Sequence, residues 1–152
     1  MAKAHPGLDA AYAAGILDGE GCLDIHYDKR NNSFYPRVRV EMTQYETVQW
    51  LQDRWPGVKV QFVTRKKNLN HSATFRWCVQ GPKSLDFIKE VLPFLQAKKQ
   101  EAELFLQFPY EDTPRKGRKL SMEIVEKRKD IKEQLSGLKT KGKGLLIWSR
   151  NI

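Results

Sequence analysis

Two carboxylates, Asp18 and Glu20, are separated by one glycine and directly follow a run of small and apolar residues. Carboxylate oxygens are preferred ligands of hard cations such as Mg²⁺, and such a cation can stabilise the charge that builds up during phosphodiester hydrolysis. The same spacing is also typical of a buried helix followed by a polar, glycine-rich turn. Asp18 and Glu20 are therefore a candidate metal site, and its interpretation depends on the element that carries it.

The residues before the carboxylates predict a helix over residues 8–18. Asp9 is suited to the N-cap position, alanines are strong helix formers, and Gly19 can end the helix. One face of this helix is bulky and carries Leu8, Tyr12 and Ile16. The other face is a stripe of small side chains at helical spacing, formed by Ala11, Ala14, Gly15 and Asp18. A stripe of this kind allows another backbone to approach closely.

The string Ala14-Gly15-Ile16-Leu17-Asp18-Gly19-Glu20-Gly21 closely resembles the signature motif of the LAGLIDADG homing endonucleases. The family pattern has aspartate at the position of Glu20 and leucine at that of Ala13. The resemblance implies that two motif helices pack face to face and that Glu20 and the Gly19 carbonyl hold a divalent metal at the DNA. Because the chain has a single motif, the resemblance implies a homodimer whose interface contains Ala11, Ala14, Gly15 and Asp18.

Two further positions match the family's active site. Gln44, after Thr43 at the end of a predicted strand, matches the active-site glutamine, and Lys98 matches a lysine near the scissile phosphate. The family's arginine one helical turn after that glutamine is replaced by Val48. The resemblance covers residues 8–108 and implies Glu20, Gln44 and Lys98 as catalytic residues. It also implies Mg²⁺ as cofactor, with Mn²⁺ able to substitute and Ca²⁺ bound without supporting cleavage.

The composition favours a polyanionic partner. The chain has 152 residues, a formal charge of +9 and a pI near 9.6, which favours nucleic acid ahead of an anionic membrane surface. No apolar run approaches the roughly 20 residues of a membrane span, and no signal-peptide core precedes residue 20. Cys22 and Cys78 match no metal-ligand or disulfide pattern. We therefore expect small packed thiols and an intracellular, reducing compartment, in an organelle or a prokaryotic cytoplasm.

The hydrophobic periods predict an α+β domain with the element order αββαββα. Alternating residues predict strands over 23–28, 35–43, 58–65 and 73–80, with Val58, Val60 and Phe62 on the apolar face of the third. Helices are predicted over 45–55 and from Pro93 to Phe108. Another helix is predicted to begin at Pro82, and its core stripe is Leu85, Ile88 and Leu92. The last predicted helix follows a Ser121 cap, and its core stripe is Ile124, Ile131, Leu135 and Leu138. We expect helices on one face of a curved antiparallel sheet. The resemblance implies that residues 1–110 form the endonuclease core. We expect residues 111–152 to form a basic C-terminal helical extension packed on the same domain, with a flexible basic segment over 139–144.

The other face of the sheet is polar and largely basic. Antiparallel sheets often expose one face to solvent, but arginine, glutamine, histidine and acidic side chains also read base edges, and a two-stranded ribbon fits the major groove. The expected DNA contacts are Asp24, His26, Asp28, Arg30, Tyr35, Arg37, Arg39, Glu41, Gln61, Arg65, Lys66, Lys67, Thr74, Arg76, Cys78, Gln80, Lys116 and Lys141.

The sequence thus predicts a homodimeric, Mg²⁺-dependent homing endonuclease that makes a double-strand break in a long pseudo-palindromic DNA site. An intron maturase that binds its own intron RNA is one alternative. A non-cleaving DNA-binding regulator on the same fold is another. The presence of Glu20, Gln44 and Lys98 together argues against the regulator, whereas nothing in the sequence separates endonuclease from maturase.

Overall fold

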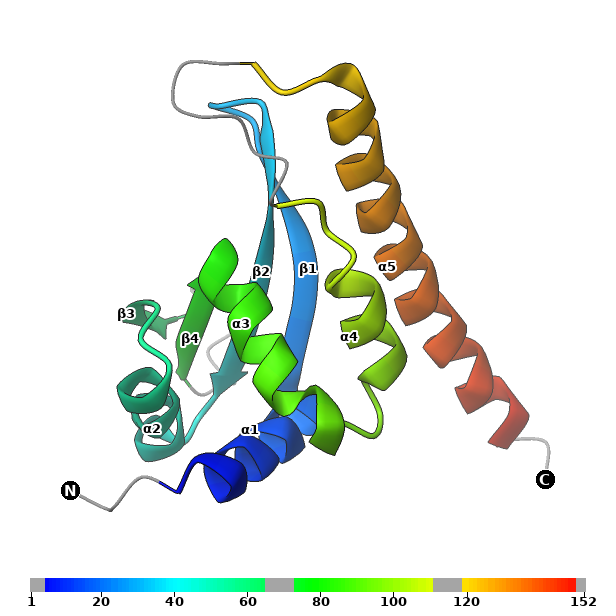
Figure 1. Cartoon of the computed structure of the whole chain (residues 1–152). Helices are drawn as coiled ribbons and strands as arrows, with labels where there is room; N and C mark the ends of the chain where they lie inside the picture. The colour runs from blue at the N-terminus through cyan, green and yellow to red at the C-terminus, as the bar shows by residue number, and fades with distance from the viewer. Residues whose placement is uncertain (1–4, 65–72, 111–118, 150–152) are drawn as a thin grey trace.

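The structure is a computed structural model that describes residues 5–64, 73–110 and 119–149, with side chains in the last range described as far as residue 139. The elements are α1 (Pro6–Glu20), β1 (Gly21–Asp28), β2 (Ser33–Met42), α2 (Tyr45–Arg54), β3 (Val58–Val63), β4 (Thr74–Gln80), α3 (Pro82–Val91), the 3₁₀ turn η1 (Leu92–Phe94), α4 (Lys99–Phe105) and α5 (Met122–Ser149). The predicted α+β class and αββαββα order are confirmed (Figure 1).

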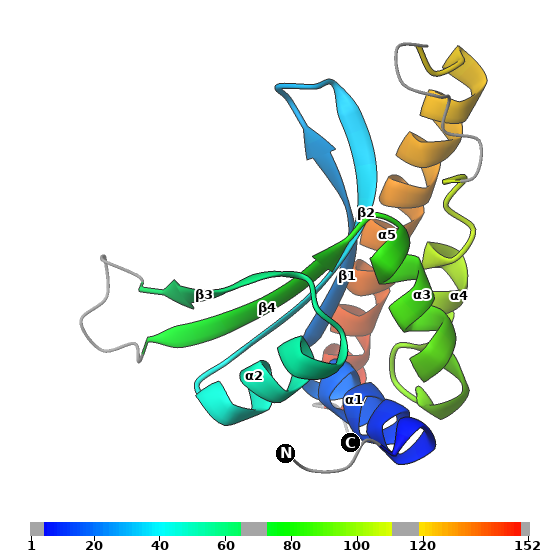
Figure 2. The ribbon, with the colours of Figure 1, turned by 60° about the vertical axis from the view of Figure 1, so that its left-hand side comes forward.

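The four strands form one antiparallel sheet in the order β1-β2-β4-β3. Strand residues alternate between two faces, so the register brings Leu23, Val38 and Val79 side by side across three strands. All three are at most 1% exposed. The helices lie against this apolar face, and the sheet bends so that the β1–β2 hairpin and the β3–β4 pair diverge (Figure 2).

The core lies between the helices and the apolar face of the sheet. Trp77 of β4 packs against Phe87 of α3 with ring centroids 5.0 Å apart, and its indole N–H donates to the Trp55 carbonyl. Helix α1 contributes Ala10, Ala13, Ala14 and Leu17. A helix that presents alanines to a sheet can approach it closely, which holds the end of α1 beside the start of β1.

The ends of α1 differ from the prediction. The helix begins at Pro6 after His5, so Asp9 lies in the first turn and is not the N-cap. Its carboxylate instead forms an ion pair with Arg54 of α2 at 2.9 Å. The helix continues through Gly19 to Glu20, and the Gly21 N–H donates to the Leu17 carbonyl. A side chain at Gly21 would collide with Leu17, so only glycine permits this direct passage from helix to strand.

Two predicted core patterns are corrected. The most buried face of α3 consists of Ser84, Phe87, Ile88 and Val91. Of the predicted stripe, Ile88 is fully buried, whereas Leu85 and Leu92 are half-buried at the edge of the core. Pro93 lies in η1 and not in a helix that runs to Phe108. A break follows, and α4 begins only at Lys99.

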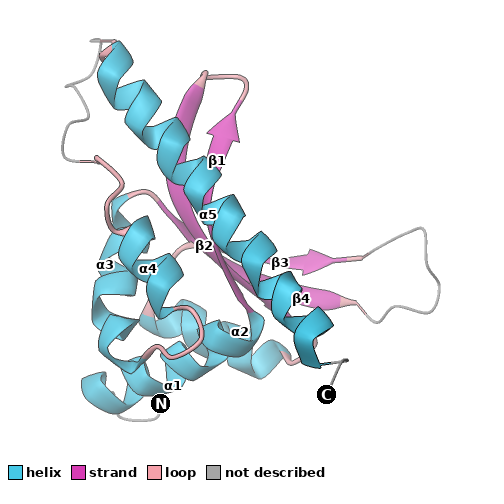
Figure 3. Ribbon diagram, turned by 90° about the vertical axis from the view of Figure 1, so that its right-hand side faces the viewer, coloured by secondary structure: helices cyan, strands magenta, loops and turns pink. Residues whose placement is uncertain are grey.

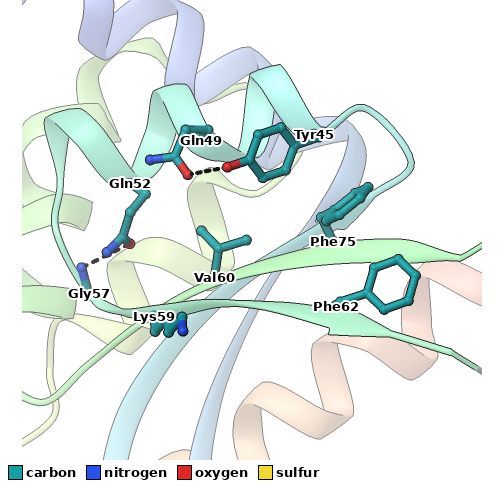
Figure 4. Close-up of a pocket in the computed structure, with 8 residues that line it drawn as sticks. All are labelled: Tyr45, Gln49, Gln52, Gly57, Lys59, Val60, Phe62 and Phe75. Atoms are coloured by element: carbon teal, nitrogen blue, oxygen red, sulfur yellow. Dashed lines mark hydrogen bonds between the residues drawn. The ribbon is translucent and has the colours of Figure 1, made fainter.

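The third corrected prediction is that Phe62 lies on the apolar face of its strand, because its side chain is 62% exposed. The pairing of β3 with β4 is irregular between Val58 and Gln61. Figure 4 shows the result: Phe62 lies at the mouth of a hollow between α2 and the β3–β4 pair, together with Tyr45 and Phe75. None of the predicted catalytic residues lines this hollow.

Helix α5 runs along the β1 side of the sheet (Figures 1 and 3). The predicted cap is confirmed by the Ile124 N–H, which donates to the Ser121 hydroxyl at 3.3 Å. Ile131 and Leu135 are buried as predicted. The backbone of residues 139–144 is helical, so this segment is not the predicted flexible one. Lysines are good helix formers, and each of the two glycines, Gly142 and Gly144, costs a helix only about 1 kcal/mol.

Among the described residues, no helix combines the length and apolarity needed to cross a lipid bilayer.

Candidate metal site and nucleic-acid interface

Glu20 is the last residue of α1, and its side chain is exposed. Within the described part of the chain, its carboxylate has no hydrogen-bond or ion-pair partner. The C-terminal end of a helix carries partial negative charge, which favours a cation beside it. An unpaired carboxylate at that position, next to the exposed Gly19 backbone, fits the oxygen-donor chemistry of a hard divalent ion.

The break between η1 and α4 brings Lys98 to the end of α1. The Lys98 ammonium donates to the Asp18 backbone carbonyl at 3.1 Å. The Asp18 carboxylate accepts two backbone N–H groups from the same break, from Gln96 and from Lys98, both at 2.9 Å. Three contacts therefore join the motif helix to the segment that carries the lysine. Asp18, predicted at a dimer interface, binds its own chain through both carboxylate oxygens.

Gln44 is the residue before α2, in extended conformation, with its side chain exposed. It follows β2, which pairs Val40 with Gly21 and so passes beside the end of α1. The Thr43 hydroxyl donates to the Gln44 side-chain oxygen at 3.1 Å. In the described ranges, no hydrogen bond joins Gln44 to Glu20 or Lys98. Val48 is fully buried and points into the core, away from any active-site role.

The exposed face of α1 differs from the predicted interface. Ala14 is 0% exposed and packs inside its own chain, so its assignment to a dimer interface was wrong. Leu8 and Tyr12, by contrast, are 72% and 55% exposed. Gly15 lies on the same side, and a side chain placed there would meet nothing within 4 Å. The free surface of the motif helix is therefore apolar and flat near its centre.

One copy of the chain supplies few metal ligands. Among the described residues, no group of three or more His, Cys, Asp or Glu side chains is placed to hold a metal ion. Since Asp18 is already bound to backbone N–H groups, Glu20 is the acidic ligand that one motif offers.

The polar face of the sheet carries two networks of ion pairs. In the first, Asp24 of β1 accepts from Arg37 of β2 at 2.9 and 2.8 Å, and from Arg39 at 3.0 Å. Burial alone would raise the pKa of Asp24, but the hydrogen bond and charge of Arg37, with Arg39 and Lys139, lower this pKa overall. Asp24 is thus a carboxylate at neutral pH.

The second network joins β2 to β4. Glu41 accepts from Arg76 at 2.9 and 2.7 Å and from the Thr74 hydroxyl at 2.7 Å. All these residues are among the predicted DNA contacts, and the structure brings them together on one face. Both acids are engaged by arginines, so the polar groups around these networks that can bind a ligand are mainly cationic.

The remaining predicted contacts are dispersed. Asp28 forms the hairpin turn, where it accepts the Arg30 N–H at 2.9 Å. His26 packs on Tyr35 at 5.0 Å, and burial with the charge of Arg37 lowers the pKa of His26. Burial raises the pKa of the Cys78 thiol.

Gln61 is exposed within β3, and Gln80 is exposed at the end of β4. Arg65, Lys66, Lys67 and Lys116 lie outside the described residues, as does the side chain of Lys141.

Sequence reasoning missed two lysines of α5. Lys132 and Lys139 donate to the backbone carbonyls of Ile25 and Leu23 at 3.1 and 2.8 Å. They bind one edge of β1 because residues seven apart share a helix face. The seven-residue spacing of these lysines, beside the buried stripe of Ile131 and Leu135, could have indicated that they contact the sheet. A lysine-rich helix face, however, ordinarily indicates only exposure to solvent.

Comparison with known proteins gives consistent results. No family model matches the chain. DNA endonuclease I-CvuI of Chlorella vulgaris is 27% identical over 155 residues, which cover 97% of this chain and 89% of the relative.

Solved structures show the same fold. I-CvuI bound to the I-CreI target in 2 mM Mg, with the DNA not cleaved, has a TM-score of 0.58 and 20% identity over 87% of this chain and 97% of that one. The archaeal intron-encoded homing endonuclease I-Vdi141I, complexed with DNA, has a TM-score of 0.64 and 13% identity over 88% and 85%. The LAGLIDADG homing endonuclease I-GzeII, in complex with its DNA target, has a TM-score of 0.57 and 14% identity over 86% and 44%.

Proposed function

The chain has both the motif and the fold of the LAGLIDADG homing endonucleases, and from this premise we propose that it is a site-specific DNA endonuclease. One observation carries the proposal: the free carboxylate of Glu20 and the ammonium of Lys98 are both held at the C-terminal end of α1, where strand β1 begins. A free carboxylate can hold a hard cation, and a lysine can place positive charge near a phosphate, so both groups can assist phosphodiester hydrolysis.

We propose Mg²⁺ as the cofactor, held by Glu20 and the Gly19 carbonyl. When bound, the ion would stabilise negative charge on the scissile phosphate and on the attacking and leaving oxygens. I-CvuI has been crystallised with the I-CreI target in the presence of Mg, with the DNA not cleaved, and with its own target in the presence of Ca. For this chain we expect Mn²⁺ to substitute and Ca²⁺ to bind without cleavage.

The residues around Glu20 have separable roles in this proposal. Lys98 places a positive charge near the phosphate, because its ammonium is held at the Asp18 carbonyl and only its remaining N–H donors can turn to a ligand. Asp18 positions Lys98 through the backbone. Gln44 hydrogen-bonds water or phosphate from the start of α2, where its side chain is exposed.

We propose that the active form is a homodimer packed through the exposed face of α1, around Ala11 and Gly15 and flanked by Leu8 and Tyr12. The contact would bring two Glu20 carboxylates together, and cations between them would offset their repulsion. A two-fold dimer would also place two polar sheet faces along one duplex and cut both strands of a pseudo-palindromic site. Free Cys22 and Cys78 thiols suit a reducing, intracellular setting.

The experiment is the selection of cleaved sites from a library of randomised duplexes incubated with the protein and Mg²⁺. We expect a long, inverted-repeat consensus and linear products with staggered ends. Tight duplex binding without any cleavage, in either Mg²⁺ or Mn²⁺, would identify a non-cleaving regulator instead.

A further inference from the structure

Two arginines on the polar sheet face are held by carboxylates along the same edge of the guanidinium, Arg37 by both oxygens of Asp24 and Arg76 by one oxygen of Glu41. Asp24 accepts from Nε and Nη2 of Arg37, and Glu41 accepts from Nε and Nη2 of Arg76, all between 2.7 and 2.9 Å. In each pair the acid therefore occupies the side edge of the guanidinium. Within the described residues, the other N–H donors of both arginines have no acceptor.

Each pair joins two neighbouring strands at directly opposed positions. Asp24 of β1 faces Arg37 of β2, and Glu41 of β2 faces Arg76 of β4. The arginine side chains are only 18% and 28% exposed, so their stems are packed and their heads are fixed. An arginine that is already ordered loses little conformational entropy when it binds a ligand.

The edge that remains free has a specific chemistry. It consists of Nη1 and Nη2, which present parallel N–H donors in one plane. In the major groove of B-DNA, guanine presents two adjacent acceptors, O6 and N7, and bidentate arginine is their most frequent partner. The other three bases present no such pair of acceptors there.

We propose that Arg37 and Arg76 each read one guanine in every half-site, and that Asp24 and Glu41 are positioning residues that hold them and do not contact bases. This inference rests on the proposed function, because it assumes that the polar sheet face lies in a major groove. It predicts guanine at two positions of each half-site. It also makes Asp24 and Glu41, which the sequence predicted as DNA contacts, supports for the arginines.

The register also sets the spacing of the two guanines. Arg76 is opposite Glu41, which is four residues from Arg37 along β2. At about 3.3 Å per residue this separation is about 13 Å. Bases on one strand are about 3.4 Å apart, so the two guanines should be about four base pairs apart, on either strand. The two-fold dimer repeats the pattern in inverted order.

Arg39 lies between these positions but is held differently. Only its Nη2 donates to Asp24, at 3.0 Å. Its Nε is buried and has no hydrogen-bond partner among the described residues. Because its side edge is not fixed by a carboxylate, the structure does not assign a guanine to Arg39.

The test is selection of bound duplexes from a randomised library in Ca²⁺, with sequencing of the pools retained by each protein variant. The variants are Arg37→Ala, Arg37→Lys, Asp24→Asn, Arg76→Ala and Glu41→Gln. The matched control is Lys89→Ala, which removes one positive charge from the exposed side of α3. Arg37→Lys keeps the charge without the two-donor edge, so it remains informative if Arg37→Ala folds poorly.

Wild type should select two guanines per half-site. Arg37→Ala and Arg37→Lys should weaken the preference at one guanine by about 5- to 150-fold, and Arg76→Ala at the other. Asp24→Asn should weaken the preference for the guanine that Arg37 reads, and Glu41→Gln the preference for the guanine that Arg76 reads. Neither variant should lower the affinity for unmatched duplexes, since each substitution removes a negative charge. Lys89→Ala should leave both preferences unchanged.

Three results would overturn the inference while the protein still binds and cleaves defined sites. One is a consensus without these guanines. Another is unchanged preferences in the arginine variants. The third is a changed preference in Asp24→Asn or Glu41→Gln at a base pair other than the one that the paired arginine reads, which would make the acids base contacts. A wild type that binds no duplex would instead refute the proposed function.

Discussion

The side-chain ammonium of Lys98 is 3.1 Å from the backbone carbonyl oxygen of Asp18, although the two residues are 80 positions apart in the chain. The Asp18 carboxylate in turn accepts the Lys98 backbone N–H at 2.9 Å. The lysine is thus held to the end of the motif helix by its side chain and by its backbone. This double contact fixes a positive charge two residues from Glu20, and the catalytic predictions depend on it.

Glu20→Gln should abolish cleavage and preserve DNA binding. The substitution keeps the size of the side chain but removes the charge that attracts a hard cation. A homodimer loses both acidic ligands at once, so the cleavage rate should fall by several orders of magnitude. Affinity should persist because it comes mainly from phosphate contacts and the sheet. The measurement is plasmid linearisation in Mg²⁺ beside duplex binding in Ca²⁺.

The matched control for Glu20 is Glu103→Gln, the same change at an exposed position of α4. This variant should cleave like wild type. Full activity of Glu20→Gln would contradict the metal-site assignment.

Lys98→Met should slow cleavage less than Glu20→Gln, because a lysine that steadies phosphate or polarises water assists the metal and does not replace it. Lys98→Arg should restore part of the rate, since it retains the charge. Lys99→Met is the control, because the neighbouring lysine is exposed at the start of α4. Single-turnover cleavage separates the variants, and equal rates for Lys98→Met and Lys99→Met would remove Lys98 from the active site.

Gly15→Leu should weaken the homodimer. Gly15 has open space in the isolated chain, so leucine is accommodated in a monomer but obstructs a second helix. Overpacking a close contact typically costs about 1–3 kcal/mol. Gly137→Leu is the control, because Gly137 of α5 also has open space around it. Sedimentation measures the dimer, and wild type that binds DNA as a monomer would contradict the prediction.

Asp24→Asn should lower the free energy of unfolding at neutral pH, by about 1.5–3 kcal/mol for lost hydrogen bonds to a charged group. The pKa of Asp24 is lowered in the folded state from an ordinary value of 3.8. The carboxylate therefore stabilises the fold above pH 3.8, and this contribution is lost as the pH falls from there through the lowered pKa.

Urea unfolding at a series of pH values tests the sign. The difference between wild type and Asp24→Asn should be constant near neutral pH and should shrink below pH 3.8. A difference that stays constant into strong acid would show that ionisation of Asp24 contributes nothing to stability.

The local parts of the fold could be predicted from the sequence alone. Alternation of Leu23 and Ile25 with Asp24 and His26 gave a half-buried strand, and Ser121 gave a helix start. Such patterns are readable because helix and strand periods depend on neighbouring residues. The motif string was likewise readable, and with it the family's fold and the three candidate catalytic residues.

Properties that depend on non-local contacts could not be predicted in this way. The sequence shows two possible faces on α1, but only packing decided that Ala14 faces its own core and Leu8 faces outward. The role of Asp18 was hidden as well, because its partners are 78 and 80 residues away.

On the sheet, too, local patterns could be predicted from the sequence, whereas the pairing of side chains across strands could not. The sequence placed Asp24, Arg37, Glu41 and Arg76 on one polar face, since the side-chain period of a strand is two. Only the strand order β1-β2-β4-β3 and its register decided which acid holds which arginine. Register and strand order depend on the packing of all the elements together, so the sequence determined which groups share the polar face, and the tertiary structure determined how they are aimed.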